Sequence, residues 1–287
     1  MTETSPGVIT WWVTLSIISV VNLVALGIVA AGLERRRDTI APAEHADRRV
    51  LLLLATVFVV GCAFRSFLPR AEGQRICLTD SWISSAMIAR WVATAAELSL
   101  VTQWSLVLRQ YARAAGLRGA VAASWLLVPF IAWAELCSWY TTLTTNFIGS
   151  VIEESTWAVT GTVVVLSFAA LLPRLTGARR RFAVFAILLN AAYVLFMVSV
   201  DVPMYWSRWK AGQAAGAHYL TLGHGWLDAQ RRRVVTLRWE DWRHEVPWMS
   251  LYFSVGVWIS LGLVRAPRFE AEPPPPTEPS PTPGAPR

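Results

Sequence analysis

The chain has 287 residues, of which 54% are hydrophobic and 16% charged, and its mean hydropathy is +0.42. Soluble domains carry about 25% charged residues, so this composition excludes an ordinary soluble globular protein and indicates a membrane protein. The 16 tryptophans, many at the ends of apolar segments, are typical of membrane–water interfaces. The net charge of +7 comes from arginines clustered in short loops between these segments, so we expect the lipid bilayer as a partner and no nucleic acid.

Apolar segments of about 20–25 residues recur along the chain, and a helix of this length crosses a bilayer. They predict an all-α, seven-helix transmembrane bundle over residues 1–265, with a flexible outer loop over residues 206–246. The first segment is interpreted as an uncleaved span, because no basic region precedes it. Prolines dominate residues 266–287, so a disordered tail is expected there. The expected spans lie near Val8–Leu33, Val50–Leu68, Asp80–Arg113, Gly119–Leu143, Phe147–Leu172, Phe182–Tyr205 and Pro247–Val264.

The arginines of the short loops predict the orientation of the bundle. Basic residues near span ends favour the cytoplasmic side, so we expect the N-terminus outside and the C-terminus in the cytoplasm of a bacterial inner membrane. The predicted outer side has only Arg70 and Arg75 in its short loops, although the loop over residues 206–246 adds seven basic residues. The predicted inner loops carry Arg35, Arg36, Arg37, Arg48, Arg49, Arg109, Arg113, Arg118, Arg174, Arg179, Arg180 and Arg181.

The third span has a polar face inside its apolar run. Arg90, Thr94 and Glu97 fall within about 60° of one another around a helix. A charge in hydrocarbon costs at least a few kcal/mol, so this face must point toward protein or trapped water. The sequence therefore predicts a bundle with a polar interior.

Charged residues of neighbouring spans reach a similar depth. Arg90 lies roughly 15 Å below the outer end of its span, Glu135 roughly 12 Å, and Glu153 and Glu154 roughly 10 Å. Because a buried unpaired charge is costly, we predict that Arg90 pairs with at least one of these three carboxylates. Glu153 should face the bundle core, and Glu154 should face a neighbouring helix or the rim of a cavity.

The intramembrane carboxylates outnumber the arginines among them. Excess carboxylates in a low dielectric hold protons or bind a cation, which favours chemistry or transport over helix packing alone. Arg65 and Asp201 are expected just under the outer surface, Asn190 near the middle and Glu97 in the inner half. We assign catalytic roles to Glu153, Glu154, Glu135 and Asp201, and ligand-binding roles to Arg90, Arg65, Glu97, Trp157, Asn190 and Tyr205.

Potential metal ligands elsewhere form no known motif. His218 and His224 are six residues apart and His244 is distant, so these histidines of the outer loop are interpreted as surface residues. Cys62 forms no CxxC pair, and the three cysteines are expected to be buried free thiols. A disulfide between Cys77 and Cys137 is the alternative. No metal site is predicted, and the cofactor is left open.

Two functions remain open on this evidence. The first is a membrane enzyme whose outward-opening pocket uses buried carboxyl groups as acid or base on a lipid-like or isoprenoid substrate. The second is a non-catalytic ligand-binding, transport or accessory subunit whose tryptophans and proline-rich tail contact other membrane proteins. The sequence has no GxSxG, P-loop or dinucleotide motif. The expected spans contain no histidine and the last contains no lysine, which argues against a bis-histidine haem and a retinal Schiff base there.

Overall fold

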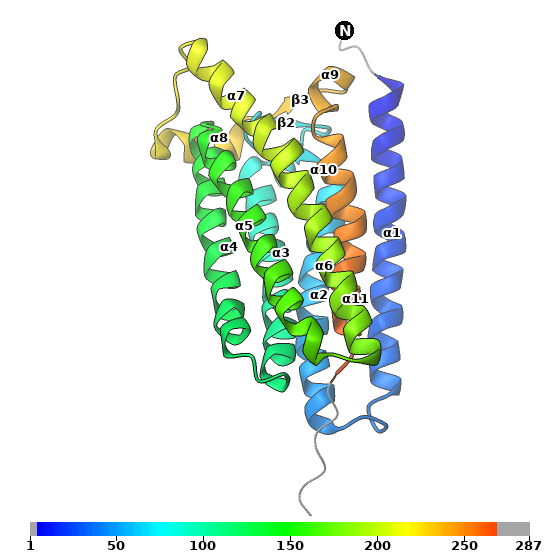
Figure 1. Ribbon diagram of the computed structural model, residues 1–287. Coiled ribbons are helices and arrows are strands. Elements are labelled where there is room, and N and C mark those ends of the chain that lie inside the picture. Colours follow the sequence, from blue (N-terminus) through cyan, green and yellow to red (C-terminus); the bar gives the residue numbers. More distant parts are fainter. Residues whose placement is uncertain (1–4, 269–287) are drawn as a thin grey trace, which may run out of the picture.

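The computed structural model describes residues 5–268, which form seven helical rods running up and down in chain order (Figure 1). Two of the rods contain a π-helical turn. The first five rods are α1 (Pro6–Arg35), α2 (Pro42–Phe67), α3 (Ala86–Ala114), α4 (Arg118–Thr144) and α5 (Ile148–Leu171). The sixth rod consists of α6 (Gly177–Phe196), the π turn η3 (Met197–Asp201) and α7 (Val202–Ala214), and the seventh of α10 (Val246–Leu251), the π turn η4 (Tyr252–Gly256) and α11 (Val257–Val264).

The rods have the composition of an integral membrane protein. Six of the described helical segments are long and apolar enough to cross a membrane, and large apolar side chains such as Leu53 and Leu195 point outward, 65% and 68% exposed. The remaining rod, α3, is long enough at 29 residues but more polar. The all-α fold is confirmed, whereas the count of seven crossings stays a prediction.

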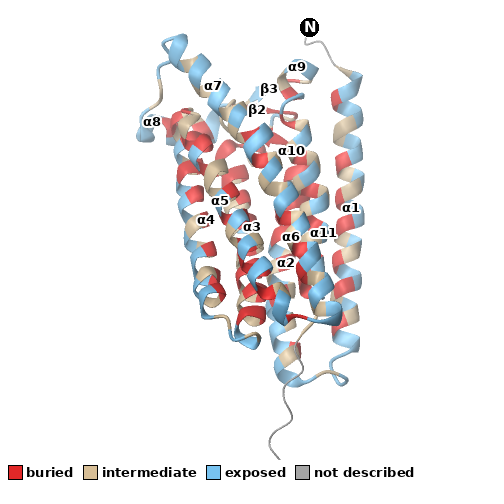
Figure 2. Cartoon of the chain, viewed as in Figure 1, coloured by how far each residue is buried: buried red, intermediate tan, exposed pale blue. Residues whose placement is uncertain are grey.

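Helix α3 lies inside the bundle, which explains how its polar face is tolerated. It packs against α2, α4, α5 and α11, and its Arg90 and Glu97 are buried. Figure 2 shows buried residues on the inward faces of the rods and exposed residues on the outward faces. The polar interior expected from the sequence is therefore present.

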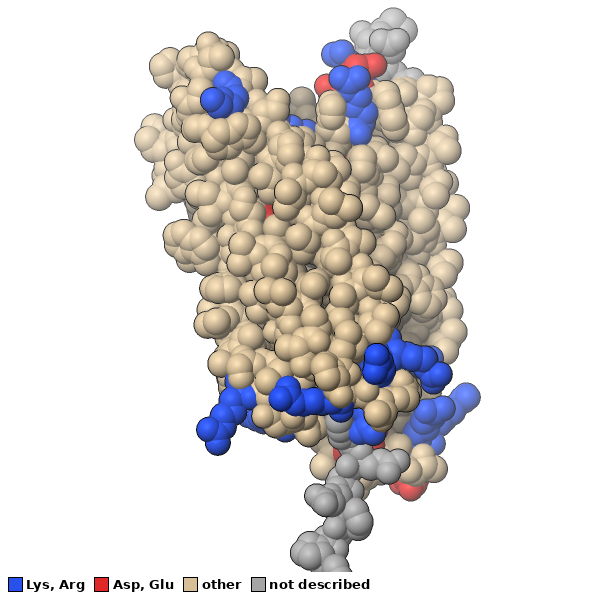
Figure 3. Space-filling view, in the orientation of Figure 1, with Lys and Arg blue, Asp and Glu red and all other residues tan. Residues whose placement is uncertain are grey.

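The two ends of the bundle differ in charge. Figure 3 shows lysines and arginines gathered at one end, where the α1–α2, α3–α4 and α5–α6 connections lie. We call this the arginine-rich end. The asymmetry agrees with the loop pattern of the sequence, and the assignment of this end to the cytoplasm stays a prediction.

The opposite end carries a small sheet that the sequence analysis did not predict. Its strands are β1 (Arg70–Ala71), β2 (Ile76–Cys77) and β3 (Val234–Val235), in the order β1-β2-β3. Strand β2 pairs antiparallel with β1 and parallel with β3. We call this the sheet end. Two-residue strands carry too few residues for an alternating pattern, so the sequence gives no signal for them.

Residues 206–246, expected to form a flexible outer loop, contain helices and a short strand. Residues up to Ala214 extend the sixth rod as α7, which ends where Gly216 adopts the left-handed φ of +63° that favours glycine. The short 3₁₀ turns η1 (Trp82–Ser84) and η2 (Leu172–Arg174) complete the connections elsewhere. After α7 the chain forms α8 (Leu222–Arg231), β3 and α9 (Trp239–Trp242).

Two further expectations concern the state of the cysteines and the start of the tail. Cys62, Cys77 and Cys137 are free and buried, as predicted, and burial raises the pKa of the Cys77 thiol. The tail begins later than residue 266, because Ala266 is buried and Arg268 Nη1 lies 3.2 Å from Asp47 Oδ2. The rest of the predicted tail, residues 269–287, lies outside the described residues.

Candidate functional site

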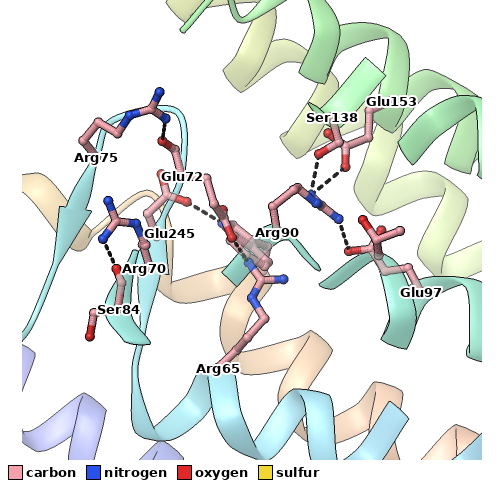
Figure 4. Close-up of polar contacts among 12 residues, drawn as sticks. Arg65, Arg70, Glu72, Arg75, Ser84, Arg90, Glu97, Ser138, Glu153 and Glu245 are labelled. Carbon is pink, nitrogen blue, oxygen red and sulfur yellow. Dashed lines mark hydrogen bonds and ion pairs between the residues drawn. The ribbon is translucent and has the colours of Figure 1, made fainter. Parts of the chain in front are cut away.

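Arg90 lies at the centre of a buried ion cluster formed by α3, α4 and α5 (Figure 4). Its Nη2 lies 3.0 Å from Glu97 Oε1 and 3.0 Å from Glu135 Oε2, and its Nη1 lies 3.5 Å from Glu153 Oε1. Nη1 also donates a hydrogen bond to Ser138 Oγ. The predicted pairing of Arg90 is thus confirmed, through Glu135 and Glu153. We call Arg90, Glu97, Glu135 and Glu153 the Arg90 cluster.

The helices place these side chains for local reasons. Glu97 follows Arg90 by two helical turns, so both lie on one face of α3, and the long arginine side chain spans the difference in depth. On α5, Gly149 permits a close approach to α4, because a Cβ there would lie 2.3 Å from the Cys137 carbonyl oxygen. Glu153 follows one turn later on the same face and is brought against Arg90.

A second set of hydrogen bonds fixes Glu135. Thr94 Oγ1 donates to Glu135 Oε2 at 2.5 Å, and Trp139 Nε1 donates to Thr94 Oγ1 at 3.1 Å. Thr94 was the third polar residue of the predicted α3 face. The face therefore acts as one connected network rather than as separate charges.

The three carboxylates of the Arg90 cluster are close enough to share a cation. One oxygen from each of Glu97, Glu135 and Glu153 lies within 4.8 Å of the others, a spacing that would suit a metal ion. In this arrangement the Arg90 guanidinium contacts all three and takes the position of the shared cation. The geometry thus favours a structural and electrostatic centre over a metal site.

A cavity of about 340 Å³ extends from the Arg90 cluster into the bundle. We call it the central cavity. Toward the arginine-rich end it lies between apolar residues of α6 and of η4–α11, including Leu189, Phe196, Val255 and Ile259. Figure 3 shows a small spot of acidic atoms in the middle of a face that otherwise presents no charged side chains. Charged residues line its other part: Arg65, Glu72, Arg90, Glu97, Glu153, Glu154, Asp201 and Glu245.

The remaining predicted site residues also line this cavity. Glu154 is partly exposed to it, and Asp201 is 6% exposed. Trp157 packs near Tyr193, Asn190 Nδ2 donates to the Ala186 carbonyl of its own helix, and Tyr205 stacks on Phe147. The structure brings all ten predicted residues to one region, nine of them at the cavity surface and Glu135 just behind it. Their catalytic and binding roles remain predictions.

Two residues that the sequence analysis did not place in the site close the cavity at the sheet end. Glu72, in the β1–β2 turn, pairs with Arg65 at 2.8 Å, and the Arg65 guanidinium lies 5.6 Å from the ring centre of Trp248 (Figure 4). Glu245 is 1% exposed and accepts hydrogen bonds from Arg208, Gln74 and Trp248 at 2.8, 2.9 and 2.7 Å. Both carboxylates come from connections, where hydropathy gives no signal of burial.

The two π turns face the same cavity from different rods. Met197 and Asp201 of η3 line it, as do Tyr252, Val255 and Gly256 of η4. Pro203 follows η3 and has no N–H to donate to the preceding turn, which is a common cause of such an irregularity. At η4, Asn22 Nδ2 of α1 donates to the Phe253 carbonyl at 2.8 Å. Irregular turns of this kind often occur at functional sites.

The histidines of residues 206–246 do not belong to this region. His218, His224 and His244 are exposed and are not among the residues that line the central cavity. Within residues 5–268 the one group of acidic, histidine or cysteine side chains with metal-ligand spacing is that of Glu97, Glu135 and Glu153. Comparison with models of protein families, with curated protein sequences and with solved structures finds no match.

Proposed function

We propose that this membrane protein binds a lipid-like or isoprenoid molecule in the central cavity and acts on it by acid–base chemistry. One observation carries the proposal. A single cavity joins the buried ion cluster around Arg90 to apolar surfaces of α6 and α11. A molecule with a polar end and an apolar chain satisfies both parts at once, whereas a purely polar solute would leave the apolar part without a partner.

The chemical groups present favour proton transfer. Glu153 touches Arg90 and Glu154 faces the cavity, so one position is fixed in the cluster while the next is open to a ligand. Carboxyl groups held away from water are effective general acids and bases. Glu153 would set the charge of the cluster, and Glu154 would exchange a proton with the polar end of the ligand. If the bound molecule leaves unchanged, the same site serves binding or transport instead.

The proposal is tested by filling the cavity from one position on α6. Ala191 and Ala192 are both exposed, but only Ala192 lines the central cavity. We expect an Ala192→Trp variant to lose the amphiphiles that copurify with the wild type in mild detergent, measured by mass spectrometry of lipid extracts per mole of protein. An Ala191→Trp variant should retain them. Equal lipid content in all three proteins would overturn the proposal.

A further inference from the structure

We infer that the ligand of the central cavity carries a protonated amine at the end of an apolar chain, and that Glu154 and Asp201 bind it. This inference rests on the proposed function and names its ligand class. It is carried by the charges of the cavity wall, by an unpaired buried carboxylate and by the aromatic rings beside it.

The ion pairs of the cavity wall do not include two of its carboxyl groups. Arg65 is paired with Glu72, and Glu245 is paired with Arg208. Arg90 is shared by the other members of its cluster. Among the ion pairs of residues 5–268 none involves Glu154 or Asp201, although both line the cavity and interact electrostatically with each other. The titratable groups of the wall that are left to face a ligand are therefore acidic.

Asp201 supplies an independent sign of a missing partner. It is 6% exposed, and within the described chain its carboxylate forms no hydrogen bond or ion pair. Buried carboxylates are otherwise paired, since an unpaired one is costly. Asp201 is also the last residue of the π turn η3, which changes the direction in which the following side chains point. Asp201 is therefore placed in the wall of the cavity.

Aromatic rings accompany both carboxylates. Trp157 lies one turn after Glu154 on α5, and Tyr205 lies one turn after Asp201 on α7, so each acid shares a helix face with a ring. Trp157 stands at 86° to Tyr193, and all three rings line the cavity. Ring faces attract organic cations such as ammonium groups.

The alternatives fit these walls less well. An anionic headgroup would meet Glu154 and Asp201, while the two arginines of the wall already hold carboxylates. A divalent metal ion requires several oxygen ligands around it, whereas aromatic rings supply none. An organic cation uses both the carboxylates and the rings, and its chain occupies the apolar part between α6 and α11.

The test compares three probes of equal chain length: dodecylammonium, dodecanol and dodecyl phosphate. Each is added at the same low mole fraction of the dodecyl maltoside that holds the purified protein, and apparent affinity is taken from the rise in unfolding temperature. We expect the wild type to bind the ammonium probe about tenfold or more tightly than either of the others. The Asp201→Asn and Glu154→Gln variants should lose this preference. A Glu240→Gln variant, whose carboxylate is exposed on α9, should keep it.

The outcomes separate this inference from the proposed function. Equal binding of all three probes, or a preference for the phosphate, overturns the cationic ligand; if Ala192→Trp still abolishes that binding, the proposed lipid site stands. Binding that Ala192→Trp does not affect overturns both. The ranking of the three probes on the wild-type protein decides the inference even if a carboxylate variant fails to fold.

Discussion

Arg90 of α3 and Glu135 of α4 form an ion pair with an Nη2–Oε2 distance of 3.0 Å, and both side chains are at least 95% buried. The pair joins two helices that are neighbours in the bundle and fixes the depth at which their polar faces meet. Because Glu97 and Glu153 contact the same guanidinium, Arg90 is the cation that three carboxylates share.

Replacing Arg90 should therefore destabilise the protein strongly. An Arg90→Met variant keeps an unbranched side chain but leaves the carboxylates without a cation, and we expect a loss of about 3–5 kcal/mol in the free energy of unfolding. Adding Glu135→Gln should recover part of this loss, since one uncompensated charge is removed. Thermal unfolding in detergent measures both variants. A stability close to that of the wild type for Arg90→Met would show that the cluster contributes little.

Asn22 should support the π turn of the seventh rod. Its Nδ2 donates to the Phe253 carbonyl, and Asn22→Ala leaves that carbonyl without this donor in an apolar environment. We expect a cost of about 1–3 kcal/mol. Ser19→Ala is the matched control on the same helix, because Ser19 is equally buried but its hydroxyl has no hydrogen-bond partner within residues 5–268. Equal effects of the two changes in thermal unfolding would contradict a specific role for Asn22.

The sequence predicts those features that depend on one segment at a time. Long apolar runs locate the rods, and the cost of a charge in hydrocarbon predicts that Arg90 must be paired inside the bundle. The depth of Glu135 and Glu153 follows from counting residues along a helix. These features depend only on the residues of one segment and on the bilayer around it, and not on how distant loops fold.

Features that depend on distant segments could not be predicted in this way. Glu72 and Glu245 lie in connections that resemble solvated loops, and their burial results from contacts with Arg65 and Arg208 on other elements. The π turns have no hydrophobic period of their own. The sixth rod continues past Tyr205 and ends at the turn in which Gly216 adopts a left-handed conformation. In the sequence, a single glycine marks the end of a helix less clearly than the change in hydropathy near Tyr205 does.

Glu245 should hold α7 to the sheet end. A Glu245→Ala variant removes the acceptor shared by Arg208, Gln74 and Trp248. We expect the local stability of residues 202–214 to fall by about 1–3 kcal/mol. Hydrogen–deuterium exchange should then be about tenfold or more faster in this segment. Glu240→Ala, at an exposed carboxylate of α9, serves as the control. Unchanged exchange in α7 would show that the contact is not needed to hold it.

The orientation in the membrane can be tested with a reporter that is active only in the cytoplasm. Fused after Arg287 it should give a signal, since the last rod ends at the arginine-rich end. Inserted after Gly216, at the turn that follows α7, it should give none. A signal from the internal position and none from the C-terminal position would reverse the predicted topology and place the sheet end in the cytoplasm.

Glu153 and Glu154 should differ in function although they are adjacent. Neighbouring helix positions point about 100° apart. Glu153 accordingly lies 3.5 Å from Arg90, whereas Glu154 lines the cavity without an ion pair among the described residues.

Replacement by glutamine keeps the size and hydrogen bonding of either side chain and removes its titration. We expect Glu154→Gln to insert and fold as the wild type does and to lose conversion or retention of the copurifying amphiphile, measured by mass spectrometry. Glu153→Gln should alter stability more, because it changes the charge around Arg90. If both variants lose stability while the amount and chemical form of bound amphiphile per folded molecule stay unchanged, the two carboxylates serve helix packing, and the acid–base proposal is wrong.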